Sequence, residues 1–248
     1  MKYKINSGME LLFKAFSKAE KKFDKRELWW RGQPVSTWDL LPRIYHREDL
    51  SDEESLLIDF RTKARSRHSE CPVQDDYSSG LFLMQHHYLP TRLLDWTESI
   101  LIAAYFVINR EKYTSKPGAL WALDPDRLNR VQFPGTSGKF VPEDEEVIPL
   151  FKHAFRPRGK RRIKKIAAIN PDEVEIRMMI QMSVFTIHGT SQPLNKIKDN
   201  EKFLMKFGIP ANVKEELSGM LFDLGIRESN LFPDLDHLAK ELKSLEYV

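Results

Sequence analysis

Apolar residues recur at helical spacing toward both ends of the chain. Residues 7–10 fit a capping box, and the apolar positions after them predict an amphipathic helix. Residues 51–54 repeat the capping box ahead of a second helical pattern. Near the C-terminus, Pro210 and Pro233 each precede a leucine-rich pattern of helical period. Helices are therefore expected on both sides of the middle of the chain.

Short apolar runs bounded by turn residues predict the strands. They cover residues 27–31, 91–96, 118–123, 147–151, 184–187 and 202–207. Residues 124–146 are rich in Pro, Gly and acidic residues and predict a loop, which we expect to be the most mobile region. Asn170 and Pro171 indicate a helix start that places Glu173 in its first turn.

Residues 85–97 mix polar and apolar side chains in a way that an ordinary core strand does not. Pro90 restricts the residue before it to an extended conformation and indicates a turn. Residues 91–96 then predict a strand, and Thr97 is placed to cap a buried helix over residues 100–108. Because α/β proteins place binding groups where a strand enters a helix, this stretch is the main candidate site.

Composition limits the class of protein. The 248 residues are 41% hydrophobic and 30% charged, which is typical of a globular protein. The apolar run of residues 100–108 is too short to span a membrane, and the N-terminus has no signal-peptide pattern. Cys71 is the one cysteine, which excludes an internal disulfide and a cysteine-based zinc cluster. We therefore expect a cytoplasmic protein with a single α+β domain.

A basic run is the strongest charge feature. Seven basic residues lie between positions 156 and 165: Arg156, Arg158, Lys160, Arg161, Arg162, Lys164 and Lys165. Composition alone favours a solvated loop or a charged strand edge. The alternative is a patch that contacts the phosphates of RNA or DNA, or an acidic protein.

Several familiar sites are excluded. The chain has no Gly-rich phosphate loop, no Gly-x-Ser-x-Gly and no His-Glu-x-x-His. His86 and His87 are adjacent, so their rings are expected to point apart rather than share a metal ion. We therefore expect no metal site. The acidic run of residues 143–146 falls in the expected loop, which makes a metal-dependent nuclease the weakest alternative.

Two polar clusters remain. The first is Arg31 with Gly32 and Gln33, at the end of an aromatic strand, where the guanidinium can bind a phosphate or a carboxylate in bidentate fashion. The alternative is a structural arginine that bridges to an acidic residue such as Asp95.

The second cluster lies in residues 85–97. Thr91 and Thr97 can orient a sugar hydroxyl, and Gln85 can use both functions of its amide. Arg92 and Asp95 are three residues apart and should face opposite sides of a strand. For Asp95 and Thr97 the alternative is a role at the start of the following helix.

Several motifs together resemble the FRG domain, a bacterial family named for a Phe-Arg-Gly motif in which Trp30 here replaces the phenylalanine. The resemblance spans residues 27 to about 240. It rests on these residues: Trp30-Arg31-Gly32-Gln33, Trp38, Leu41-Pro42, Gln85-His86, Leu89-Pro90-Thr91-Arg92-Leu93-Leu94-Asp95-Trp96-Thr97, Ala104-Tyr105-Phe106, Arg177, Gln181, Phe185 and Leu231-Phe232-Pro233-Asp234-Leu235.

The order of motifs is also similar, more distantly, to NAD-dependent ADP-ribosyltransferases. That resemblance implies that Arg31 holds NAD and that Thr91 or Thr97 supports the ribose on the nicotinamide side. Gly32, Gln33, Gln85, His86 and Arg92 are the other implied NAD-binding residues. A late glutamate would stabilise the transition state. Glu173 and Glu175 have its spacing but fall in a helical first turn, so Gln181 or Asp95 is the implied substitute.

The resemblances imply residues 1–26 as an N-terminal helix and residues 27–248 as an FRG domain with a helical C-terminal part. They imply a mixed, mostly antiparallel split sheet flanked by helices, as in ADP-ribosyltransferases. The implied function is an enzyme that cleaves NAD and modifies a nucleic acid or a protein, as a toxin or phage-defence effector held by an antitoxin or a regulatory protein. The alternative is a non-catalytic module that binds a nucleotide or phosphate.

Overall fold

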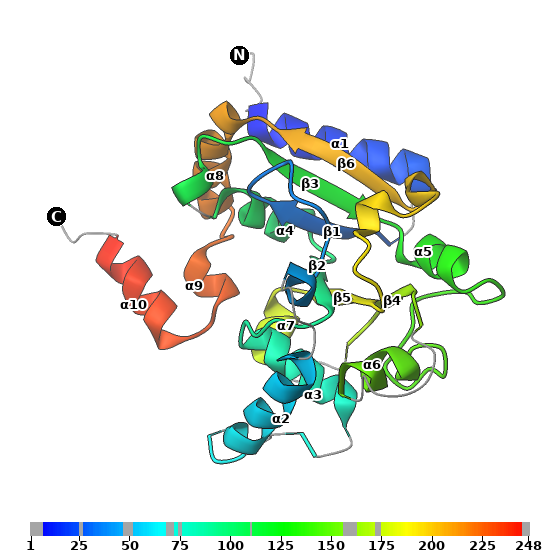
Figure 1. Cartoon of the computed structure of the whole chain (residues 1–248). Helices are drawn as coiled ribbons and strands as arrows, with labels where there is room; N and C mark the ends of the chain where they lie inside the picture. Colours follow the sequence, from blue (N-terminus) through cyan, green and yellow to red (C-terminus); the bar gives the residue numbers. More distant parts are fainter. Residues whose placement is uncertain are drawn as a thin grey trace, which may run out of the picture.

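The computed structural model describes residues 7–24, 27–46, 52–67, 72–73, 76–109, 111–155, 163–171 and 175–244. In these residues a six-stranded sheet has the strand order β4-β5-β2-β1-β3-β6 (Figure 1). The strands are β1 Trp29–Gln33, β2 Leu93–Thr97, β3 Gly118–Leu123, β4 Ile166–Ile169, β5 Ser183–His188 and β6 Leu204–Ile209. Each neighbouring pair of these named strands is antiparallel, so the expected antiparallel character is confirmed and the expected mixture of strand directions is corrected.

The sheet is narrowest at its centre. One registered pair, Trp30 with Thr97, joins β1 to β2, whereas β1 pairs with β3 along its whole length. The sheet is therefore continuous in strand order, but its halves β4-β5-β2 and β1-β3-β6 share only this one registered pair. This short pairing leaves room for side chains between the two central strands.

Helices α1 Ser7–Phe23, α4 Ile100–Ile108 and α8 Lys214–Asp223 pack on the half that contains β1, β3 and β6. The periodic apolar positions predicted for the first helix form their common core, including Leu12, Ala15, Ala19 and Phe23. A Cβ atom on Gly32 of β1 would lie 1.9 Å from the carbonyl oxygen of Ala103 in α4. Only glycine therefore allows α4 to lie this close to β1.

Helices α2 Asp52–Ala64, α3 Tyr77–His86 and α6 Ile148–Phe155 pack against the other half of the sheet, in the lower part of Figure 1. The remaining helices are α5 Pro125–Gln132, α7 Ile176–Ile180, α9 Glu228–Leu231 and α10 Leu235–Ser244. Short 3-10 turns complete the chain at Arg43–His46, Glu111–Tyr113, Leu194–Lys196, Asn200–Lys202 and Ala211–Val213.

Helix α5 lies where a loop was expected. Asp124 is its N-cap, since the side chain accepts a hydrogen bond from the amide of Arg127 at 2.9 Å, and Pro125 follows as the first helical residue. The buried Asn129 donates to the carbonyl of Ala168 at 2.9 Å and accepts from its amide at 2.8 Å. The side chain of Asn129 in α5 therefore satisfies both main-chain hydrogen-bonding groups of Ala168 in the edge strand β4, as a neighbouring strand would.

Three further expectations are corrected. Residues 147–151 were expected as a strand, but α6 begins at Ile148 and includes residues 148–151, because a short apolar run does not distinguish a strand from a buried helix. Ser99, rather than Thr97, is the N-cap of α4 and accepts from the amide of Ile102 at 3.4 Å. Helix α7 begins only at Ile176, with Glu175 as its N-cap. Ser51, Cys71 and Glu173 lie outside the described residues.

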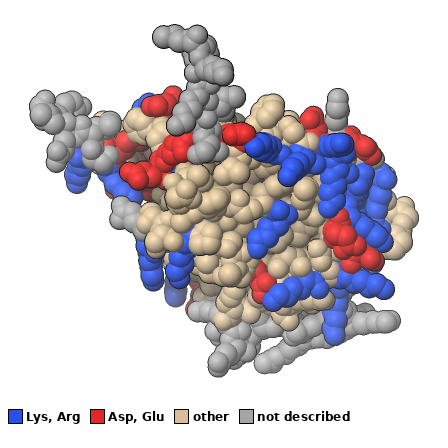
Figure 2. Space-filling model, turned by 90° about the horizontal axis from the view of Figure 1, so that it is seen from above, with Lys and Arg blue, Asp and Glu red and all other residues tan. Residues whose placement is uncertain are grey.

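Charged residues are spread unevenly over the surface. Figure 2 views the molecule from above, and Lys and Arg gather toward one end of this face with Asp and Glu among them. Of the predicted basic run, residues 156–162 lie outside the described residues. Lys164 is exposed, and the Lys165 ammonium lies 4.3 Å from the centre of the Phe133 ring. Within the described chain, none of the helices has the length and apolar character needed to cross a membrane.

Candidate functional site

A cavity of about 950 Å³ opens beside β1 and β2, which share one registered pair. Both central strands line it, together with residues from the turn before α2 and from α7, α9 and α10. Among the described residues that line it, the arginines are Arg31, Arg43 and Arg177, and the carboxylates are Asp39, Asp95 and Glu228. Aromatic rings, among them those of Trp38, Tyr88 and Phe232, form part of its wall. The lining therefore suits a ligand that has both anionic and ring-shaped parts.

Arg31 reaches from β1 to β2. Its Nη1 atom donates to the carbonyl oxygen of Asp95 at 2.5 Å and lies 3.7 Å from the Asp95 carboxylate. The bridge to Asp95 considered from the sequence is therefore present. The Arg31 side chain is 23% exposed, and the residue lines the cavity, so the bridging guanidinium also faces the cavity space.

Asp95 is held by a short chain of side-chain hydrogen bonds. Gln85 Nε2 donates to both carboxylate oxygens, at 2.9 Å each, and Gln85 Oε1 accepts from the hydroxyl of Thr91. The Thr91 oxygen in turn accepts from the amide of Leu93 at 3.1 Å. Because the hydroxyl of Thr91 occupies the amide oxygen, the amide nitrogen of Gln85 faces Asp95. The Asp95 side chain is 55% exposed, so this oriented carboxylate is accessible from the cavity.

The four residues Arg31, Gln85, Thr91 and Asp95 thus form one connected group, which we call the Arg31–Asp95 network. Residues 26–116 match the family model of the FRG domain. This match supports the FRG family for that segment, and the whole Arg31–Asp95 network lies inside it. The comparisons with curated proteins and with solved structures gave no match.

Outside the FRG match, α7 supplies a further cation, Arg177, for which the sequence indicated no binding role. The Arg177 guanidinium lies between two rings, 4.7 Å from the centre of Tyr88 and 4.6 Å from that of Phe232. Its Nη1 atom donates to the carbonyl of His86 at 3.3 Å. Stacking of this kind positions a guanidinium without neutralising its charge.

The C-terminal helices also contribute to the cavity beside the FRG match. Glu228 of α9 receives a hydrogen bond from Lys240 at 2.9 Å, and the ring of His237 stacks on Phe232 with centroids 4.7 Å apart. The sequence motif around Phe232 belonged to the resemblance, but nothing in it indicated which side chains face the cavity.

Three predicted site residues line the cavity with their polar groups already engaged. The Thr97 hydroxyl donates to the carbonyl of Gln181 at 2.7 Å, and Gln181 Nε2 donates to the carbonyl of Leu231 at 2.9 Å. Gln33 Oε1 accepts from the indole of Trp121 at 2.8 Å. All three side chains are buried, and their hydrogen bonds hold the walls of the cavity together.

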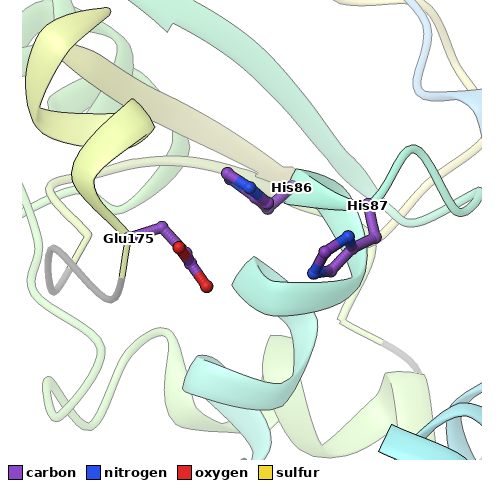
Figure 3. Close-up of side chains that lie close together, drawn as sticks. All are labelled: His86, His87 and Glu175. Carbon is purple, nitrogen blue, oxygen red and sulfur yellow. The ribbon is translucent and has the colours of Figure 1, made fainter. Parts of the chain in front are cut away.

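Two other predicted NAD-binding residues do not line the cavity. Arg92 is buried and forms an ion pair with Glu53 of α2, with Nε 3.0 Å from Oε1. Its prediction as a ligand contact is therefore corrected, because the guanidinium is buried against Glu53 and does not line the cavity. His86 contributes its carbonyl to Arg177, and its side chain lies near those of His87 and Glu175 (Figure 3).

His188, at the end of β5, is a buried imidazole near the network. Burial, with the positive charge of Arg31 as a smaller cause, lowers the pKa of His188 to about 3. Its Nε2 atom lies 2.9 Å from the hydroxyl of Thr186, and its carbonyl accepts from the hydroxyl of Tyr45. The ring is therefore neutral near pH 7 and adds no charge beside Arg31.

His86, His87 and Glu175 form a second polar group. One ligand atom from each lies within 4.8 Å of the others, and the two rings have centroids 5.0 Å apart. The expectation that adjacent rings must point apart is wrong here. Helix α3 ends at His86 and His87 is its C-cap, so regular helical directions no longer separate the two side chains.

Proposed function

We propose that the protein binds NAD in the cavity between β1 and β2, cleaves its bond to nicotinamide and transfers ADP-ribose to a macromolecule. The observation that carries this proposal is the Arg31–Asp95 network. It places a cation and an accessible, oriented carboxylate 3.7 Å apart at the wall of a cavity of suitable size.

The cavity supports recognition of a dinucleotide through charge and stacking. Arg31, Arg43 and Arg177 offer guanidinium groups, which suit a diphosphate because each can donate two parallel hydrogen bonds. Aromatic walls such as those of Trp38 and Tyr88 offer surfaces for the adenine or nicotinamide ring.

Asp95 is the proposed carboxylate for the chemical step. When the N-glycosidic bond breaks, its electron pair leaves with nicotinamide, which becomes neutral, and positive charge develops on the ribose. A nearby carboxylate lowers the energy of that transition state. The ribose carbon then bonds to a nucleophilic atom of the target, which loses its proton to solvent. Gln85 orients Asp95, whereas Thr97 and Gln181 support the wall.

A second candidate is a nucleotide-binding module without catalysis. It is favoured by Thr97 and Gln181, two of the residues expected to act on NAD, because their polar groups are hydrogen-bonded to backbone carbonyls. Such a module would use the same cavity and the same arginines, and it would bind a nucleotide without releasing nicotinamide.

The wider role is proposed from the resemblance. The target is a nucleic acid or a protein that contacts the basic run of residues 156–165, where Lys164 is exposed. A role as a cytoplasmic toxin or phage-defence effector under the control of a partner protein follows from the same resemblance.

The test uses NAD labelled in its adenylate phosphate, incubated with purified protein and total cell lysate. Wild type is compared with Arg31→Ala and with Arg65→Ala, which removes an exposed arginine of a surface turn. Label on a macromolecule with wild type and Arg65→Ala, but not with Arg31→Ala, supports transfer. If NAD stays intact with wild type, transfer is rejected, and a calorimetric titration with NAD then tests the binding module.

A further inference from the structure

The ends of α3 and α7 bring three metal-ligating side chains together, and we propose that His86, His87 and Glu175 bind one divalent transition-metal ion, of which Zn²⁺ is the best match. Two imidazole nitrogens and one carboxylate oxygen lie within 4.8 Å of one another. Figure 3 shows the three side chains turned toward a common space between the two helix ends.

The donor set decides the class of metal. Two histidines with one carboxylate suit zinc and its neighbours in the first transition row, whereas Mg²⁺ and Ca²⁺ prefer oxygen ligands alone. Three protein ligands leave a fourth tetrahedral position for water.

The spacing requires only a local adjustment. Tetrahedral coordination at about 2.1 Å places ligand atoms about 3.4 Å apart, so the present group has to close by about 1.4 Å at most. His87 is exposed and Glu175 is half-buried, so rotation of their side chains can supply this movement without repacking of the core.

The position of this group links it to the cavity. Gln85, which orients Asp95, directly precedes His86, and Arg177 lies two residues after Glu175. Arg177 already donates to the carbonyl of His86. A bound ion would fasten α3 to α7 and fix the two cavity residues Gln85 and Arg177 relative to each other. We therefore assign the metal a positioning role.

The test needs no NAD, so it stands independently of the proposed function. Full-length protein is treated with a chelator, dialysed and titrated with Zn²⁺ by calorimetry, and with Co²⁺ by visible absorption. We expect one equivalent per chain with a dissociation constant of about 10 µM or lower, and Co²⁺ bands of a four-coordinate nitrogen and oxygen site.

Variants identify the ligands. His87→Ala and Glu175→Gln should each weaken Zn²⁺ binding at least about tenfold and abolish the Co²⁺ bands. The matched control Glu201→Gln, at an exposed position outside the group and the cavity, should bind Zn²⁺ as wild type does. Circular dichroism checks that each variant is folded, and His87 is exposed, so its loss spares the core. Absence of saturable binding by wild type, or binding unchanged in His87→Ala and Glu175→Gln, would overturn the proposal.

Discussion

The amide nitrogen of Gln85 lies 2.9 Å from each carboxylate oxygen of Asp95. The two residues are ten positions apart, on the last turn of α3 and in the middle of β2. Their contact orients a carboxylate at the edge of the cavity, next to the guanidinium of Arg31.

Replacing Gln85 tests whether the orientation of Asp95 matters. Gln85→Leu keeps similar volume but removes both hydrogen bonds to the carboxylate. We expect nicotinamide release to slow by about tenfold to a hundredfold, with NAD affinity changed much less, because the lost contacts act on the carboxylate and not on the ligand. Steady-state kinetics and calorimetry measure the two effects. Gln192→Leu, an exposed site, is the control, and equal rates in both variants would contradict the prediction.

Gly32 tests the close approach of β1 and α4. A Cβ at this position would lie 1.9 Å from the Ala103 carbonyl oxygen and 2.9 Å from the Val107 amide nitrogen. Because both are backbone atoms, we expect Gly32→Ala to lower the free energy of unfolding by about 3 kcal/mol or more. A Cβ on Gly208 would meet no atom within 4 Å, so Gly208→Ala should change the free energy of unfolding by less than about 1 kcal/mol. Urea denaturation measures both, and a tolerated Gly32→Ala would refute this packing.

The buried pair of Arg92 and Glu53 should matter for folding and not for ligand binding. Glu53→Gln leaves a buried guanidinium without its counter-charge, so we expect a loss of about 3 to 5 kcal/mol in the free energy of unfolding. Glu10→Gln, which breaks the exposed pair with Lys14, should cost less than about 1 kcal/mol. NAD affinity of folded Glu53→Gln should equal that of wild type. If Glu53→Gln instead lost NAD affinity without a loss of stability, Arg92 would have to be counted as a residue of the binding site.

His188 predicts a specific loss of stability in acid. Its pKa is lowered to about 3 in the folded protein, mainly by burial, whereas histidine in an unfolded chain titrates near 6.5. Between these values the unfolded chain binds a proton that the folded protein does not. The free energy of unfolding therefore falls as pH decreases from about 6.5 toward 3, by up to about 1.4 kcal/mol per pH unit. His188→Gln should remove this pH-dependent component, and identical slopes in wild type and His188→Gln would disprove it.

Local signals were sufficient where they agreed with one another. Strand β3 occupies the predicted residues 118–123, because a run that is apolar throughout stands between Pro117 and Asp124. The amphipathic pattern after Ser7 likewise became α1. All four members of the Arg31–Asp95 network were candidates from the sequence, because polar residues within or at the end of an apolar stretch are typical of a binding site. Their contacts were not predictable, since they depend on how α3 packs against β2.

The features that the sequence did not predict depend on long-range packing. Helix α5 has few apolar residues, and Pro and Gly are frequent in the residues that follow it, so the segment was expected to be a loop. The helix start that Asp124 and Pro125 form was not sufficient to indicate it. Helix α6 is a short apolar segment whose type is set by the surface it packs on. The approach of Glu175 to His86 depends on the relative placement of α3 and α7, for which the sequence contains no local signal.

The most direct test of the central claim is the initial rate of nicotinamide release from NAD by wild type, Asp95→Asn and Asp223→Asn. Asparagine keeps the shape of Asp95 but removes the charge, and Asp223 is an exposed residue at the end of α8. We predict a decrease on the order of 10² to 10³ for Asp95→Asn, with NAD still bound, and a wild-type rate for Asp223→Asn. A wild-type rate in Asp95→Asn, or no release by wild type itself, would contradict the account.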